Sequence, residues 1–180
     1  AATRVSISRK RRQLYEENLS RHGITIPEEK LFLGSFAEHD GQRAVEALFQ
    51  QDGTIPEAIL SLNDQMAAGA IEALLNRGIS VPADIAVTGF DDVEENTLLP
   101  CTLTTIHVPV WEMLTVLMEQ ITKDLRNKGK TTKKQQREGV TLPATFVRRE
   151  SCGIYSGDEI HSDDCIENIR SNPATASASQ

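Results

Sequence analysis

The sequence predicts an α/β fold in which a parallel sheet is flanked by helices. Short apolar runs at residues 30–34, 58–62 and 85–89 are typical of strands, and the segments between them carry apolar residues at helical spacing. The order is therefore β-α-β-α-β. Parallel strands need a crossover of this kind, and the helices then cover both faces of the sheet.

Residue types at the segment ends place the helices. Residues 9–21 predict a first helix that Gly23 stops, because glycine adopts the left-handed conformation that ends many helices. Asp40 is expected to cap a second helix over residues 41–51. Asn63 or Asp64 is expected to cap the alanine-rich helix that follows, since short polar side chains accept hydrogen bonds from the free N–H groups of a first turn.

Beyond Pro100 the pattern loosens. Residues 103–106 predict a strand and residues 140–149 a final strand pair. Residues 109–127 predict a helix with one apolar stripe, made of Val110, Met113, Leu114, Leu117, Met118 and Ile121. Residues 128–137 are polar throughout and predict an exposed loop.

Composition limits the classes of function. The 180 residues carry a formal net charge of -7, which argues against nucleic-acid binding by the chain as a whole. Three cysteines form neither a disulfide framework nor a zinc motif, and no apolar run is long enough to cross a membrane. We expect a cytoplasmic protein in which residues 1–151 form one domain or part of a larger one, followed by a disordered acidic and low-complexity tail over residues 152–180.

Polar side chains follow each predicted strand, at the edge where open parallel sheets bind their ligands. They are Ser35 and Phe36, then Asn63 and Asp64, then Asp91 and Asp92. Carboxylates and amides pair with hydroxyl groups, and an aromatic face packs on the C–H surface of a sugar ring. The three loops therefore predict a site for a polyhydroxylated ligand.

Each of these residues also has a purely structural role open to it. Asn63 or Asp64 can cap the next helix, the two aspartates at 91 and 92 can cap or begin a turn, and Phe36 can belong to the core. The basic run at residues 9–12 lies where positive charge opposes the helix dipole, so either solvent or a ligand group compensates it.

The sequence offers no constellation for catalysis. It contains no Gly-x-Ser-x-Gly, no phosphate-binding loop and no His-Glu-x-x-His, and its four histidines share no metal-ligand spacing. We therefore expect a binding protein without cofactor or metal, and not an enzyme.

Three motifs occur in order: N-D-x-M-A-x-G-A, V-P-x-D-I-x-V-x-G-F-D-D and P-x-L-T-T-I, with LPATFVRRES near the end. Together they resemble the effector-binding domain of the LacI/GalR family of transcriptional regulators, over roughly residues 9–151. The resemblance implies a periplasmic-binding-protein-like fold, in which two parallel α/β lobes joined by three crossovers hold a small effector between them. This chain would supply one lobe and the closing segments.

The resemblance also implies four ligand-binding residues. Arg11 matches the arginine at the start of the first helix, and Phe36 matches the aromatic residue after the next strand. Asn63 matches the asparagine of the N-D pair, and Asp91 matches the first aspartate of G-F-D-D, which leaves Asp92 as a cap or turn residue.

The family usually has glycine three residues after that arginine, where this chain has Leu14. Arg9 or Arg12 is therefore an alternative match for the arginine.

As a function, the resemblance implies sensing of a small polar effector, a sugar or sugar derivative. Binding shifts lobe closure and controls DNA binding by a headpiece absent from this chain, in a homodimer. An isolated lobe is expected to bind weakly. The Ser151-Cys152-Gly153 exit also resembles sensors fused to histidine kinases or diguanylate cyclases, and a solute-binding protein is a third reading.

Overall fold

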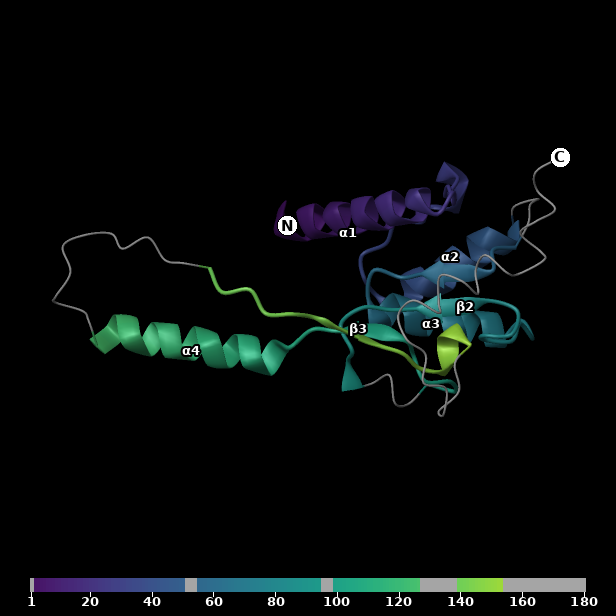
Figure 1. Ribbon diagram of the computed structural model, residues 1–180. Helices are drawn as coiled ribbons and strands as arrows, with labels where there is room; N and C mark the ends of the chain where they lie inside the picture. Colours follow the sequence, from purple (N-terminus) through teal and green to yellow (C-terminus); the bar gives the residue numbers. More distant parts are fainter. Residues whose placement is uncertain (1, 51–54, 95–98, 127–138, 154–180) are drawn as a thin grey trace.

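The computed structural model describes residues 2–50, 55–94, 99–126 and 139–153 (Figure 1). The predicted loop at 128–137 lies outside these residues, and so does the predicted tail from residue 154 onward.

The central sheet begins with two parallel strands. β1 (Ala58–Leu60) pairs with β2 (Ala86–Thr88), and Ile59 lies opposite Val87. α3 (Asp64–Leu75) is the crossover between them. The predicted parallel arrangement is therefore confirmed for this pair.

Among the described residues, the other two strands form a separate two-stranded sheet. β3 (Thr105–His107) and β4 (Thr145–Val147) run antiparallel, with Ile106 opposite Phe146. Thr88 forms a single parallel bridge with Thr104, which joins β2 to the start of β3. Only one strand of the predicted pair at 140–149 forms in the described part of the chain.

α2 (Glu38–Gln50) packs closely on α3 because glycines lie at the contact. A Cβ atom at Gly41 would lie 1.9 Å from the Met66 carbonyl oxygen, and one at Gly69 would lie 1.9 Å from that of Glu38. Larger residues would force the helices apart. This close helix packing helps to bury the hydrophobic core, which is made of Val45, Ala67, Ala70, Ile71, Ala73, Leu74, Ile85, Val87 and Leu103.

α1 (Ala2–Arg21) begins earlier than the prediction and ends where it was predicted to end. Gly23 has a φ of 75°, and the N–H of Ile24 donates to the Leu19 carbonyl at 3.0 Å. This hydrogen bond and the left-handed glycine form a Schellman motif, which satisfies a carbonyl that the helix end leaves free.

Two predictions of local structure were wrong. The first is the strand predicted at residues 30–34. Lys30 ends the short 3-10 helix η1 (Glu28–Lys30), and residues 31–34 pair with no strand among the described residues; Leu33 is 93% exposed there. An apolar run becomes a strand only when a neighbouring ladder covers it.

Asp40 does not cap α2, because the helix begins at Glu38. The Asp40 carboxylate lies in the first turn and reaches back, where its Oδ2 accepts hydrogen bonds from the backbone N–H of Ser35 (2.6 Å) and of Ala37 (3.2 Å). A carboxylate in the first turn can thus hold the preceding loop while the dipole favours its charge.

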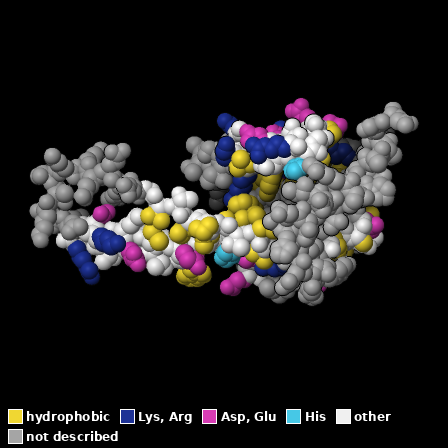
Figure 2. All heavy atoms as spheres, in the orientation of Figure 1, with side chains coloured by type: hydrophobic (Ala, Val, Ile, Leu, Met, Phe, Trp, Pro, Cys, Tyr) yellow, Lys and Arg dark blue, Asp and Glu magenta, His cyan; other side chains and the backbone are white. Residues whose placement is uncertain are grey.

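α4 (Val110–Arg126) lies apart from α2, α3 and β2 (Figure 1), and none of its residues is buried. Its predicted apolar stripe is instead exposed, as Figure 2 shows along that helix. No described helix combines the length and the apolar composition needed to cross a membrane. Within the same residues, no group of three His, Cys, Asp or Glu side chains could hold a metal ion.

Candidate functional site

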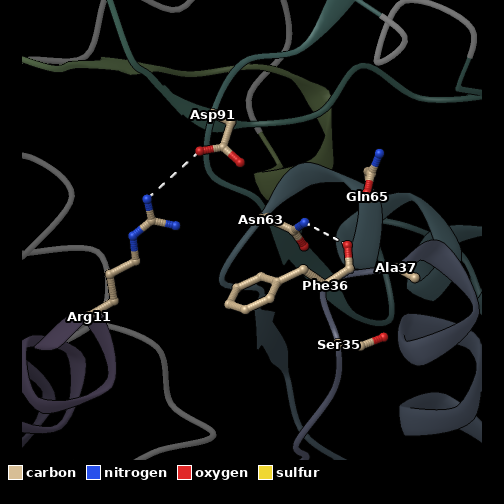
Figure 3. Close-up of a pocket in the computed structure, with 7 residues that line it drawn as sticks. All are labelled: Arg11, Ser35, Phe36, Ala37, Asn63, Gln65 and Asp91. Carbon is tan, nitrogen blue, oxygen red and sulfur yellow. Dashed lines mark hydrogen bonds and ion pairs between the residues drawn. The ribbon is translucent and has the colours of Figure 1, made fainter. Parts of the chain in front are cut away.

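An open cavity of about 390 Å³ lies at the carboxyl edge of β1 and β2 (Figure 3). Its walls come from α1, the loop before α2, the start of α3 and the loop after β2. The lining residues are Arg11, Ser35, Phe36, Ala37, Asn63, Gln65 and Asp91. All four residues predicted to bind a ligand therefore meet in one cavity, although their role toward a ligand stays a prediction.

Arg11 extends from α1 to the cavity, where its guanidinium group makes three contacts. One guanidinium nitrogen donates to the Leu62 carbonyl at 2.6 Å, and another lies 3.8 Å from Asp91 Oδ1. The guanidinium also lies 3.6 Å from the centroid of the Phe90 ring, a favourable cation–π distance. The β1 and β2 ends thus fix this side chain from both sides.

The structure decides between the three arginines of the basic run. Arg12 points elsewhere and pairs with Glu16 in the next turn at 2.6 Å, and Arg9 is exposed and does not line the cavity. Arg11 is the one that enters the site, because helical geometry turns neighbouring residues about 100° apart.

Phe36 and Asn63 hold each other in place. Asn63 Nδ2 donates to the Phe36 carbonyl at 2.9 Å, while Asn63 Oδ1 accepts the N–H of Met66 at 3.1 Å and so caps α3. Asn63 therefore is both a helix cap and a cavity residue. Phe36 has a φ of 73° and is half-buried, and Figure 3 shows its ring extended into the cavity.

The two aspartates after β2 diverge. Asp91 lines the cavity, and its pKa is raised: burial raises it most, the nearby Arg11 charge lowers it, and the Asp64 charge raises it again. Asp92 instead pairs with Arg149 at 2.7 Å and with His107 at 2.9 Å. Asp92 was expected to be a cap or turn residue, and its φ of 60° suits a turn, but its side chain ties strand ends together.

Asp64 is not a cavity residue. It is almost fully buried, with Oδ1 accepting from the Thr105 hydroxyl at 2.6 Å and Oδ2 from the Val93 N–H at 3.0 Å. It therefore joins the start of α3 to β3 and to the loop after β2.

Sequence reasoning did not assign Gln65 and Ala37 to the site, and it named Ser35 only as a residue after a strand. Ser35 is held by Asp40, to which its hydroxyl donates at 2.8 Å. Gln65 comes two residues after the cap of α3, so its place in a first turn at the same sheet edge was the available signal.

The lining can bind hydroxyl groups in several directions. Arg11 offers N–H donors, the Asp91 carboxylate offers acceptors, and Asn63 and Gln65 can do both; the Ser35 hydroxyl, which donates to Asp40, can still accept. The Phe36 ring adds an apolar face. One cation and one anion make up the charged part of the lining.

A family model of the periplasmic binding protein-like domain matches residues 1–152 of the chain. The chain belongs to the periplasmic binding protein-like domain family. This fold class was predicted from the sequence and is confirmed.

Curated members similar to this chain are transcriptional regulators. The regulator AscG of Escherichia coli is 35% identical over 100 residues, which are 56% of this chain and 30% of AscG. The repressor MelR of Bacillus subtilis is 34% identical over 125 residues, which are 69% of this chain and 34% of MelR.

Among solved structures, a LacI family regulator from Lactobacillus casei with bound sucrose matches with a TM-score of 0.67 and 27% identity. The match covers 80% of this chain and 51% of that one. The predicted relationship to LacI/GalR regulators is thereby confirmed. The chain spans about a third of the curated relatives' length and about half of that solved chain.

Proposed function

We propose that this chain is the effector-sensing part of a LacI/GalR-type transcriptional regulator, and that its cavity binds a neutral sugar or sugar derivative. The observation that carries the proposal is the meeting of Arg11, Phe36, Asn63 and Asp91 in one cavity from four separate segments. The regulator relatives support it, and one of them holds sucrose in its structure.

The charges of the lining favour a neutral ligand over an anionic one. The Arg11 guanidinium already faces the Asp91 carboxylate at 3.8 Å, and it donates to a backbone carbonyl as well. A phosphate or carboxylate on the ligand would meet Asp91 at close range, where like charges repel. Hydroxyl groups can accept from Arg11 and donate to Asp91 without breaking that balance.

We infer a second lobe from the exposed stripe on α4. Val110, Met113, Leu117 and Ile121 are all exposed on a helix that lies apart from the core. Contiguous exposed apolar patches are typical of interaction surfaces. We assign this face to the complementary lobe, which would close over the cavity when an effector binds.

The remaining parts of the proposal concern the whole regulator. A DNA-binding headpiece would read lobe closure, two copies would form a homodimer, and the protein would act in the cytoplasm without catalytic activity. Residues 1–151 would belong to the effector domain and residues 152–180 would form a separate tail. The regulator relatives favour this output over a histidine kinase or a diguanylate cyclase.

The first test is a thermal-shift screen of the full-length regulator with neutral sugars, nucleosides and sugar phosphates. A bound ligand raises Tm by mass action. A rise with glucose, sucrose or ribose and none with glucose 6-phosphate is expected. A rise with sugar phosphates alone would contradict the neutral-ligand assignment, and a rise with nucleosides alone would contradict the sugar.

A second test uses the 180-residue chain and NMR, because one lobe is expected to bind weakly. The backbone amides of Asn63, Gln65 and Asp91 should shift on titration with the neutral sugar that stabilises the regulator most. The amide of Asp84, which lies in a turn outside the cavity lining, is the internal control.

A further inference from the structure

Both carboxylate oxygens of Asp92 are hydrogen-bonded, one to the Arg149 guanidinium and one to the His107 ring. Oδ1 accepts from the Arg149 guanidinium at 2.7 Å, and Oδ2 lies 2.9 Å from His107 Nδ1. The ring nitrogen must be the donor, because a carboxylate only accepts. The Asp92 side chain is only 17% exposed, so solvent screens these pairs less than it screens surface pairs.

These contacts join three strand ends. Asp92 follows β2, His107 is the last residue of β3, and Arg149 comes two residues after β4. In the chain, α4 follows β3 and precedes β4, so the β3–β4 pair carries α4 between its two strands. One carboxylate thus ties the sheet edge that bears the cavity to the strand pair that bears α4.

Arg149 is anchored in turn to the two buried residues that precede β3. Its second guanidinium nitrogen donates to the Leu103 carbonyl at 2.8 Å. Its backbone N–H donates to the Thr104 hydroxyl at 2.8 Å, and that hydroxyl donates to the Arg149 carbonyl at 2.9 Å. Leu103 and Thr104 are fully buried, so their hydrogen bonds hold Arg149 in a fixed position next to Asp92.

Asp91, the cavity residue, is the immediate neighbour of Asp92 and is also bound to β3. Its N–H donates to the Ile106 carbonyl at 3.0 Å, and its carbonyl accepts from Val108 at 3.5 Å. Asp91 has a φ of 117° and Asp92 a φ of 60°, conformations that L-residues rarely adopt. The surrounding contacts must hold the backbone there.

Charge on Asp92 is maintained by the same contacts. Burial raises the pKa of Asp92, but the hydrogen bonds and charges of Arg149 and His107 together lower it by more than burial raises it. The net shift is therefore downward. Asp92 is therefore a carboxylate throughout the neutral range.

We propose that Asp92, His107 and Arg149 form a latch that positions the Asp91 carboxylate in the cavity and fixes the angle of the β3–β4 pair to the sheet. Asp92 is a positioning residue here and does not touch the ligand. Its effect on ligand affinity rests on the proposed function, whereas its effect on the Asp91 backbone does not.

The test of the latch itself needs no ligand and uses the 180-residue chain. Hydrogen exchange of the Asp91 and Val108 amides is measured in the wild type and in Asp92→Asn, which keeps the shape and removes the charge. Exchange at both amides should rise severalfold. In wild type, nitrogen-detected spectra of His107 should show the proton on Nδ1, and Asp92→Asn should lower that population.

Two further variants keep the result decisive. Asp84→Asn is the matched control, because Asp84 is an exposed aspartate that accepts a backbone hydrogen bond from Ser80 away from the cavity; it should leave the Asp91 exchange unchanged. If Asp92→Asn does not fold, His107→Ala serves instead, since His107 is nearly half exposed and supplies only one arm. Unchanged Asp91 and Val108 exchange in a folded latch variant would overturn the proposal.

The ligand arm uses glucose as the probe. Asp92→Asn should weaken glucose binding by roughly fivefold to tenfold, with Asp84→Asn unchanged. If the wild type fails to bind glucose, the proposed function fails for that sugar. The latch is then tested only by the hydrogen exchange of the Asp91 and Val108 amides. Faster exchange together with unchanged glucose affinity would overturn the positioning role.

Discussion

The Arg11 guanidinium lies 3.8 Å from the Asp91 carboxylate in the lining of the cavity, although Arg11 belongs to α1 and Asp91 follows β2. The pair is partly exposed, so it contributes little stability by itself. Its importance is geometric, because it places a donor and an acceptor side by side on the cavity lining, where one ligand hydroxyl group can accept from Arg11 and donate to Asp91.

Replacing Asp91 should separate binding from stability. Burial raises the pKa of Asp91, which means that the fold stabilises its charged form less than water does. Asp91→Asn should therefore leave Tm unchanged or higher, while neutral-sugar binding falls. Asparagine also tolerates positive φ better than most residues. Calorimetry and thermal melts, with Asp84→Asn as control, check this; unchanged affinity would rule out Asp91 as a ligand contact.

Acid should remove binding before it unfolds the chain. The pKa of Asp91 is raised, so this carboxylate protonates first as pH falls toward the ordinary aspartate value of about 3.9. The pKa values of Asp92 and Asp40 are lowered, and hydrogen bonds from the Thr102 N–H and hydroxyl lower that of Glu150. The stabilisation that these carboxylates provide is present above their ordinary pKa values and is lost only as pH falls through the lowered ones.

Parallel melts and sugar titrations over a pH series check this order. Binding that survives until the melting temperature collapses would contradict it. Asp92→Asn should flatten the acid limb of the stability curve, since one of the groups that resists protonation is gone.

Loss of the Asp40 charge should loosen the loop that carries Ser35 and Phe36. The Asp40 carboxylate accepts from the Ser35 backbone, the Ser35 hydroxyl and the Ala37 backbone, and these hydrogen bonds lower its pKa. Asp40→Asn should lower Tm and speed exchange at the Ser35 amide. Asp84→Asn is again the control, and an unchanged Ser35 amide would show that the loop does not depend on this charge.

Gly69→Ala should be destabilising although alanine favours helices. In an exposed helix interior this change stabilises by about 1 kcal/mol. At Gly69 the added Cβ would lie 1.9 Å from the Glu38 carbonyl, so α2 must move. We expect a net cost of about 1–3 kcal/mol by denaturant melts. Gly139→Ala, where nothing lies within 4 Å, should be neutral; a stabilising Gly69→Ala would refute the close packing.

The apolar stripe of α4 should bind a hydrophobic dye in the 180-residue chain. Leu117 and Met118 are both about half exposed on it. A Leu117→Gln, Met118→Gln double variant should reduce dye fluorescence with little change in Tm, because neither side chain belongs to the core. In the full-length regulator the same stripe should bind much less dye. Equal dye binding in both proteins would contradict its assignment to a second lobe.

Sequence by itself determined the order α2-β1-α3-β2, the central parallel pair and the polar residues after its strands, whereas Arg11 was matched to the site through the resemblance to the LacI/GalR family. Periodicity fixes these features because each depends on residues near one another in the chain, such as the cap at Asn63 or the end of β2 before Asp91. The predicted strand at 30–34 failed for the complementary reason, since a strand needs a partner that local sequence does not specify.

Only the tertiary structure decided which arginine enters the cavity and what Asp92 does. Arg11 is selected by the contacts of Leu62, Phe90 and Asp91, which lie far along the chain. Asp92 turns away because Arg149 and His107 offer a charged donor and a ring N–H from two other strand ends. Electrostatic partners of this kind are set by folded geometry, and the spacing of residues in sequence does not encode them.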